Sequence, residues 1–181
     1  MANFSIAFEY MLPNETYAPT DPRYGKVTTD NDGGLVRFGV NSNSLGKALL
    51  QTNPTFYTTM PNTEAILVCS NLYNITIWQS IRGNDIQSQR VADKLLDMAT
   101  NMGATEASKL CQRAVSVNVD GVIGPLTIDA INNEAENIVL KGLVYWWLWF
   151  ITQTVNNNPQ DKQYEDDWTT RAEKLPAVTG A

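Results

Sequence analysis

The sequence contains no histidine among its 181 residues. Histidine is the usual general base of Ser-His-Asp and Cys-His sites and the commonest nitrogen ligand of zinc, so these classes of site lose a central residue. The two cysteines, Cys69 and Cys111, are too few for a closed zinc site, and each lies on an apolar helical face. We therefore expect both to be small buried residues, and we expect no metal or organic cofactor. If the chain is a hydrolase, carboxylates must do the acid and base work.

Basic residues are also scarce, with 13 Lys and Arg against 19 Asp and Glu and a net charge of −6. This balance argues against a nucleic-acid partner, which normally requires a basic patch. The N-terminus has no basic region before an apolar run, because Glu9 interrupts the apolar residues from Met1 to Leu12. We therefore expect synthesis in the cytoplasm without a signal peptide. The chain length suits one domain, or one domain with a small subdomain.

The most apolar stretch runs from Ile138 to Ile151 and contains Lys141. It is shorter than the roughly 20 residues that span a bilayer, so we expect a buried core helix and no stable membrane insertion. A membrane-seeking segment is the second interpretation. Three tryptophans in this stretch cannot all face one direction on a helix, so at least one is expected at a groove or the surface, namely one of Trp146, Trp147 and Trp149.

Hydrophobic periodicity predicts a mainly α fold. The expected helices lie near residues 4–12, from Pro61 onward, at 88–101, 105–115 and 138–151, from Pro125 onward, and at 161–175. The segment 14–43 is rich in Asn, Thr, Asp, Pro and Gly, which is too polar for a core. A short apolar alternation at 36–40 within it predicts a strand or a hairpin edge. Long loops of this kind are often functional, although a surface excursion is an equally open interpretation.

The most distinctive motif runs from Leu110 to Thr127. A helix carrying Leu-x-Gln-Arg-Ala is followed by a turn at Asp120-Gly121, and Gly124-Pro125 then opens a second helix. By local chemistry alone this unit is a helical hairpin. Together with other motifs in the same order, it resembles glycoside hydrolase family 108, the N-acetylmuramidases of phage and bacterial origin that include endolysin-like lysozymes. The other motifs are Phe8-Glu9-Tyr10-Met11, Gly33-Gly34 to Val40, Thr63 to Trp78, Asp97 to Gly103 and Trp168-Thr169-Thr170-Arg171.

The resemblance implies a lysozyme-like helical domain with a small β-hairpin or loop region and a C-terminal helical peptidoglycan-binding subdomain. The corresponding ranges are 1–103 for the muramidase region and 104–181 for the peptidoglycan-binding region. The implied activity is bacteriolytic: cleavage of the β-1,4 bond between N-acetylmuramic acid and N-acetylglucosamine in peptidoglycan. The implied place of action is the cell wall or periplasm, and the protein would reach it through a holin or a secretion system.

By the same resemblance, Glu9 becomes the catalytic general acid. A carboxyl at a helix end, partly desolvated, stays protonated until it donates to the glycosidic oxygen. For the second carboxylate the candidates are Asp30 and Asp32, and each is equally suited to capping the turn beside Gly33. The expected substrate-binding residues are an arginine, three aromatic residues and two polar residues, each also suited to packing: Arg37, Phe38, Tyr73, Trp78, Asp97 and Asn101.

Several positions depart from the family pattern. Tyr10 and Met11 follow Glu9 where the family has two glycines, Val36 replaces a threonine, and the loop from Glu9 to Gly33 is longer than usual. These departures leave two further interpretations open. One is a catalytically weakened protein that binds peptidoglycan or a partner protein. The other is a lytic transglycosylase, because that reaction also runs on one glutamate.

Overall fold

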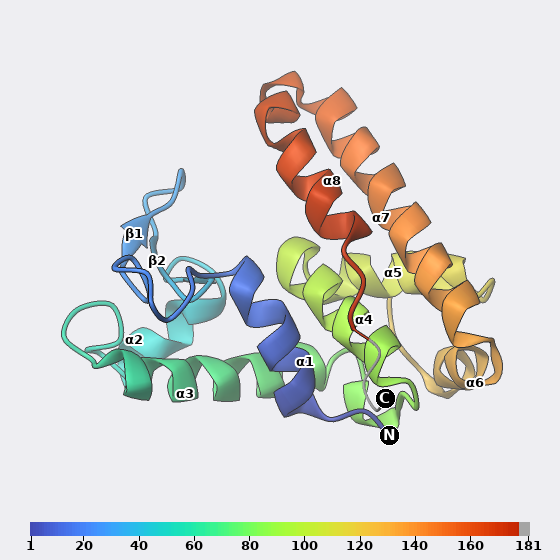
Figure 1. Cartoon of the computed structure of the whole chain (residues 1–181), viewed down its shortest axis with the longest axis horizontal. Coiled ribbons are helices and arrows are strands. Elements are labelled where there is room, and N and C mark those ends of the chain that lie inside the picture. The colour runs from blue at the N-terminus through green and yellow to red at the C-terminus, as the bar shows by residue number, and fades with distance from the viewer. Residues whose placement is uncertain (178–181) are drawn as a thin grey trace. The chain divides into compact units, whose positions relative to one another are not determined.

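The computed structural model describes residues 1–177, and these are mainly helical with one small antiparallel sheet (Figure 1). This confirms the predicted fold class. The N-terminal elements are α1 (Phe4–Met11), η1 (Leu12–Asn14), β1 (Thr28–Thr29), β2 (Leu35–Arg37), β3 (Val40–Asn41), η2 (Leu45–Ala48), α2 (Leu49–Thr52) and α3 (Asn62–Tyr73). The remaining elements are η3 (Asn74–Trp78), η4 (Gly83–Asp85), α4 (Gln89–Met102), α5 (Ala104–Ala114), α6 (Pro125–Asn133), α7 (Glu136–Asn157), η5 (Pro159–Tyr164) and α8 (Glu165–Glu173).

The chain divides into two compact units. The first combines Met1–Tyr10 with the chain from Asn74 onward, and the second is Met11–Tyr73. The predicted boundary between 1–103 and 104–181 falls between α4 and α5, which belong to the same unit and pack against each other. Residues 178–181 of the predicted binding region lie outside the described residues. The functional division at residue 103 therefore stays a prediction.

The second unit contains the sheet, whose strands follow the order β1-β2-β3. Val36 pairs with Thr28 on one side and with Asn41 on the other, so the expected hairpin near 36–40 is the central part of a three-stranded meander. Side chains from the sheet, the following loop and α3 form the core of this unit, among them Phe38, Val40, Phe56, Tyr57, Cys69 and Tyr73. The polar segment 14–43 is thus held by a few buried anchors rather than by a continuous apolar face.

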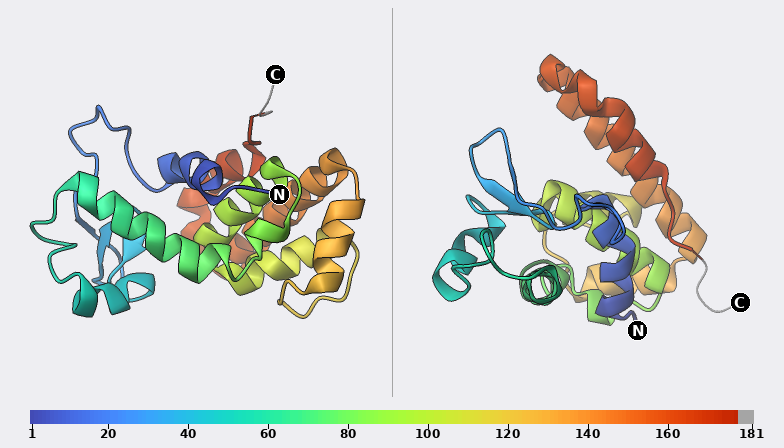
Figure 2. Two further views of the ribbon diagram at one scale, coloured as in Figure 1. Left: turned by 90° about the horizontal axis from the view of Figure 1, so that it is seen from below. Right: turned by 60° about the vertical axis from the view of Figure 1, so that its left-hand side comes forward.

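The first unit is built around α4, whose residues Val91 to Ala99 are all buried. The Ser88 side chain accepts a hydrogen bond from the Val91 N–H and caps the helix. Helix α4 packs against α5 and α7, and α7 packs along α8, as the right-hand view of Figure 2 shows. The expected helix at 161–175 is in fact η5 followed by α8, because Asp161 lies in a 3₁₀ turn.

Helix α7 is longer than the apolar stretch that predicted it, since it runs from Glu136 to Asn157. Glutamine, threonine and asparagine extend it at the C-terminal end, where the hydroxyls of Thr152 and Thr154 donate to the carbonyls of Leu148 and Phe150 four residues earlier. By length and composition alone α7 is long and apolar enough to cross a membrane, and 33% of its most apolar window is buried in the protein. Its buried side chains, including Leu143 and Trp147, belong to the core of the first unit.

Candidate functional site

Glu9 lies on α1 and is exposed to solvent. The buried face of this helix is taken by Ala7, Phe8 and Met11, so the helical rotation turns Glu9 outward. The partial desolvation that we expected for a general acid is therefore wrong for Glu9. A different glutamate, Glu15, lies six positions further along the sequence and is half-buried.

Glu15 follows η1 and is half-buried in the second unit. Its backbone N–H donates to the Leu12 carbonyl at 2.9 Å, which closes the turn and fixes where its side chain begins. The side chain lines a cavity of about 210 Å³ together with Thr16, Tyr17, Arg23, Lys26, Val27, Thr28, Val36 and Phe38. Within residues 1–177, Glu15 is the one carboxylate that lines this cavity.

The Glu15 carboxylate lies directly against the backbone of Gly39. A Cβ at Gly39 would lie 2.5 Å from Glu15 Oε2 and 2.7 Å from the Tyr73 hydroxyl oxygen. Phe38 and Gly39 both have positive φ, 50° and 73°, so two consecutive residues hold a conformation that L side chains rarely adopt. Arg37 pairs with Val40 across the turn, so Phe38 and Gly39 are the two central residues of a hairpin of the type that requires positive φ at both positions.

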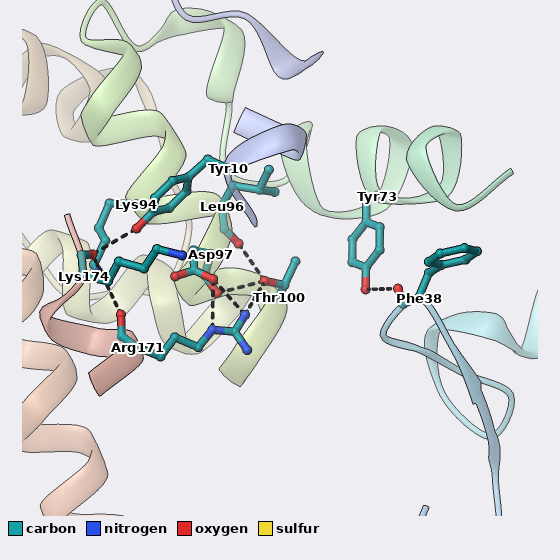
Figure 3. A network of polar contacts seen from close by, with 9 residues as sticks. All are labelled: Tyr10, Phe38, Tyr73, Lys94, Leu96, Asp97, Thr100, Arg171 and Lys174. Atoms are coloured by element: carbon teal, nitrogen blue, oxygen red, sulfur yellow. Dashed lines mark hydrogen bonds and ion pairs between the residues drawn. The ribbon is translucent and has the colours of Figure 1, made fainter. Parts of the chain in front are cut away.

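Helix α3 holds this turn in place through two donors. The Tyr73 hydroxyl donates to the Phe38 carbonyl at 3.3 Å (Figure 3), and the Cys69 thiol donates to the same oxygen at 3.5 Å. Burial, with a smaller contribution from the Glu15 charge, raises the pKa of Cys69. The thiol therefore stays protonated and unreactive, as expected of a small buried cysteine. Cys111 is also buried and free.

The rim of the cavity carries positive charge and an aromatic ring. The Arg23 guanidinium lies 3.8 Å from the centre of the Tyr17 ring and forms an ion pair of 2.8 Å with Asp21. This pairing with Arg23 lowers the pKa of Asp21 to about 2. Lys26 is exposed at the same rim. A half-buried carboxyl below an aromatic and cationic rim is suited to binding a polar ligand and to transferring a proton.

Arg37 is buried and does not face the cavity. Its guanidinium donates to the carbonyls of Gly25, Phe56 and Met60 and to the side chain of Asn62. Burial lowers its pKa from the ordinary value. Arg37 therefore ties the loops around the sheet together, and the substrate contact expected for it is replaced by these internal bonds.

The three aromatic candidates are also buried. Phe38 reaches the cavity wall, whereas Tyr73 supports the turn behind it. Trp78 belongs to the first unit, where its indole N–H donates to Asn84 Oδ1 at 2.8 Å and its ring contacts Phe4 edge-on. Of the three, Phe38 alone lines the Glu15 cavity.

Asp30 and Asp32 lie at the turn between β1 and β2, and both are exposed. Asp32 Oδ1 accepts the Gly34 N–H at 2.8 Å, and the Asn41 amide donates to both aspartates. The bonds from Gly34 and Asn41 lower the pKa of Asp32. Neither aspartate lines the Glu15 cavity, so their observed contacts fit the turn-capping interpretation.

Asp97 and Asn101 belong to the first unit and do not form one site. Asp97 is buried, and its Oδ1 accepts hydrogen bonds from Arg171 Nε at 3.0 Å and Nη2 at 2.8 Å (Figure 3). Lys94 is also buried there and donates to the carbonyls of Arg171 and Lys174. Asn101 is exposed and lines a separate cavity of about 300 Å³. Two motifs that we treated separately, Asp97 to Gly103 and Trp168 to Arg171, are thus joined by one buried ion pair.

Gln112 organises the motif between α5 and α6. Its amide nitrogen donates to Asp120, to the Val122 carbonyl and to Thr127, and its oxygen accepts the Gly121 N–H at 2.8 Å. The polar residues that make this motif distinctive therefore bond to each other. Their observed role is to build the turn.

Sequence reasoning missed Glu15. The resemblance assigned the general acid to Glu9 at the end of the first helix, whereas the half-buried glutamate is Glu15, which follows the 3₁₀ turn η1 that contains Pro13. A usable signal was present, since the loop to Gly33 is shorter when it is counted from Glu15. Among the described residues, no group of three or more His, Cys, Asp or Glu is arranged to hold a metal ion.

Comparison with known proteins gives a likeness in fold. The sequence matches no family model, and no curated protein is significantly similar to it. Among solved structures, SagA of Brucella abortus is similar, with a TM-score of 0.69 and 20% identity over 93% of this chain and 88% of that chain. At this identity the two chains share a fold, and no residue role is transferred.

Proposed function

We propose that this protein is a peptidoglycan hydrolase that cleaves the β-1,4 bond between N-acetylmuramic acid and N-acetylglucosamine, with Glu15 in place of Glu9 as the general acid. The observation that carries the proposal is the half-buried Glu15 carboxyl in a cavity at the end of a helical turn. The absence of histidine from the sequence adds support, because acid catalysis by a carboxyl needs none.

In this proposal the protonated Glu15 carboxyl donates its proton to the glycosidic oxygen as the bond from that oxygen to the anomeric carbon breaks. Water supplies the hydroxyl that bonds to the anomeric carbon, and the proton that water releases restores protonated Glu15. The Phe38-Gly39 turn lies against the carboxylate, and the Tyr17 ring with Arg23 offers a face for a sugar. Peptidoglycan is the proposed partner, reached through a holin or a secretion system.

Clearing of purified peptidoglycan and the release of reducing ends test the assignment. We expect Glu15→Gln to lose activity by about 100-fold or more, because it removes the proton donor. Glu9→Gln is the matched control, since it makes the same change on the exposed face of α1 and should clear peptidoglycan like the wild type. Equal activity of the wild type and Glu15→Gln would refute the role of Glu15.

A lytic transglycosylase is the second candidate. It is favoured by the single carboxylate that lines the cavity within residues 1–177, because a two-carboxylate hydrolase needs another. Mass spectrometry of the products separates the two reactions, since anhydro ends replace reducing ends in the transglycosylase reaction.

A peptidoglycan-binding protein without activity is the remaining candidate, favoured by Val36 at the cavity wall, where the family carries a hydroxyl. Binding of the wild type to peptidoglycan without either product would support it.

A further inference from the structure

Helix α7 carries an apolar stripe on the surface of the first unit, which the proposed function does not use. Ile138, Tyr145 and Trp149 are 47%, 62% and 40% exposed, and their helical spacing places them on one face with Lys141. We call these four residues the α7 stripe. Two large aromatic side chains exposed on the same helix face contribute to an apolar patch, and the largest such patch on a protein surface is often an interaction site.

The stripe is broadened by neighbours on both sides. On one side, the ring of Trp146 lies 5.3 Å from that of Tyr145 and 5.7 Å from that of Trp149. On the other side, Val144 and Leu148 lead into a mainly apolar cavity of about 440 Å³, closed at its far wall by Leu175 and Glu173. The exposed surface therefore continues into a groove that apolar groups can enter.

Two positive charges lie on or beside the stripe, although the chain is acidic overall, and the exposed Glu173 of the adjoining groove is followed directly by the exposed Lys174. Lys141 lies on the stripe, and the Arg113 guanidinium lies 5.4 Å from the Trp146 ring and 5.9 Å from the Trp149 ring. Glu136, the one acidic residue of α7, is paired with Arg90 at 2.7 Å. Tryptophan and tyrosine beside lysine and arginine are the side chains that populate the boundary between bilayer and water.

The opposite face of α7 excludes a spanning helix. Val139, Leu143, Trp147 and Ile151 are buried, and Lys94 lies 4.4 Å from the centre of the Trp147 ring. Withdrawing α7 into a bilayer would expose this core and the buried amine. The helix can therefore meet a bilayer only by lying on it.

We propose that the α7 stripe docks this protein on the surface of a lipid bilayer that contains anionic lipids. Ile138, Tyr145 and Trp149 enter the boundary region, and Lys141 and Arg113 contact the anionic headgroups. This contact is reversible and independent of the Glu15 cavity.

Co-sedimentation with vesicles of phosphatidylcholine, with and without phosphatidylglycerol, tests the proposal. We expect the wild type to bind the vesicles that contain phosphatidylglycerol, with a blue shift of tryptophan emission and quenching by brominated acyl chains. The double variant Tyr145→Ser/Trp149→Ser should bind at least tenfold more weakly. Tyr145→Ser alone perturbs packing least, because Tyr145 is the more exposed of the two, and it should weaken binding in the same direction.

Leu67→Ser/Leu126→Ser is the matched control, because these leucines are 70% and 80% exposed on α3 and α6 and do not belong to the stripe. This control should bind like the wild type. Absence of vesicle binding by the wild type would overturn the proposal, as would equal binding by the stripe variants. Light scattering that shows a wild-type dimer, dissociated by Tyr145→Ser, would assign the stripe to a second copy of the chain instead.

Discussion

The position of the Glu15 carboxylate depends on Gly39, a residue without a side chain. Gly39 allows the backbone to touch Glu15 Oε2, and its φ of 73° is one that glycine adopts without strain. Phe38 holds a similar φ of 50° despite its large side chain, because burial of the ring and two bonds to its carbonyl offset the cost. The site is thus shaped by backbone conformation as much as by side-chain chemistry.

Gly39→Ala should displace the Glu15 carboxylate. The new methyl group would meet the carboxylate and the Tyr73 hydroxyl well inside contact distance, so we expect a loss of about 1 to 3 kcal/mol in the free energy of unfolding. Activity on peptidoglycan should fall with it. Urea unfolding and the clearing assay measure the two effects.

Gly33→Ala provides the control for Gly39→Ala. Gly33 has a φ of 77°, yet nothing lies within 4 Å of its Cβ position. Gly33→Ala should lower the free energy of unfolding by about 1 kcal/mol through backbone strain alone and should leave activity unchanged. Equal losses of activity in Gly39→Ala and Gly33→Ala would show that the loss in Gly39→Ala does not come from displacement of the Glu15 carboxylate.

At the scale of elements, helix positions could be predicted because their signals are local. Ser88 caps α4, Pro125 begins α6, and the apolar period of α5 is contained in its own sequence. The choice between Glu9 and Glu15 could not be predicted in the same way. Which carboxylate faces a cavity depends on segments further along the sequence, here the loop that carries Lys26 and the strand β2 that carries Val36. For the same reason, the ion pair between Asp97 and Arg171 could not be predicted, because the two residues belong to motifs far apart in the sequence.

Gln112 is the residue on which the α5–α6 connection depends. Gln112→Ala would leave the buried Gly121 N–H without its acceptor and would remove the amide NH₂ group that donates to Asp120, Val122 and Thr127. We expect a loss of about 2 to 4 kcal/mol in the free energy of unfolding, since each unsatisfied buried group costs about 1 to 3 kcal/mol. Chemical denaturation measures it. The exposed Gln79→Ala should change stability by less than about 0.5 kcal/mol, and equal effects of the two substitutions would contradict the structural role of Gln112.

At the scale of the whole molecule, α4 places several charged groups inside the first unit. Burial raises the pKa of Asp93 from 3.8 to about 6, against the hydrogen bond from Gln89. Burial also lowers the pKa of Lys94 from 10.5 to about 8, against the attraction of Asp97. Both groups therefore disfavour their charged forms, and both are charged between about pH 6 and pH 8.

The pH dependence of stability follows from these two groups with opposite signs. For Asp93 the folded state binds the proton more tightly, so its contribution is present below pH 4 and is lost as pH rises through about 6. For Lys94 the folded state binds the proton less tightly, so its contribution is present above pH 10.5 and is lost as pH falls through about 8. Together, Asp93 and Lys94 should lower the free energy of unfolding most between about pH 6 and pH 8, where both side chains are charged.

Asp93→Asn tests the part of this pH dependence that comes from Asp93. The amide keeps an acceptor for Gln89 and never ionises, so we expect it to raise the free energy of unfolding at pH 7 by about 1 to 3 kcal/mol. The gain should shrink toward zero near pH 4, where the wild-type carboxyl is itself protonated. Urea denaturation of both proteins at pH 4 and pH 7 measures the difference. A gain of the same size at both values would mean that packing, and not the charge of Asp93, sets the stability of α4.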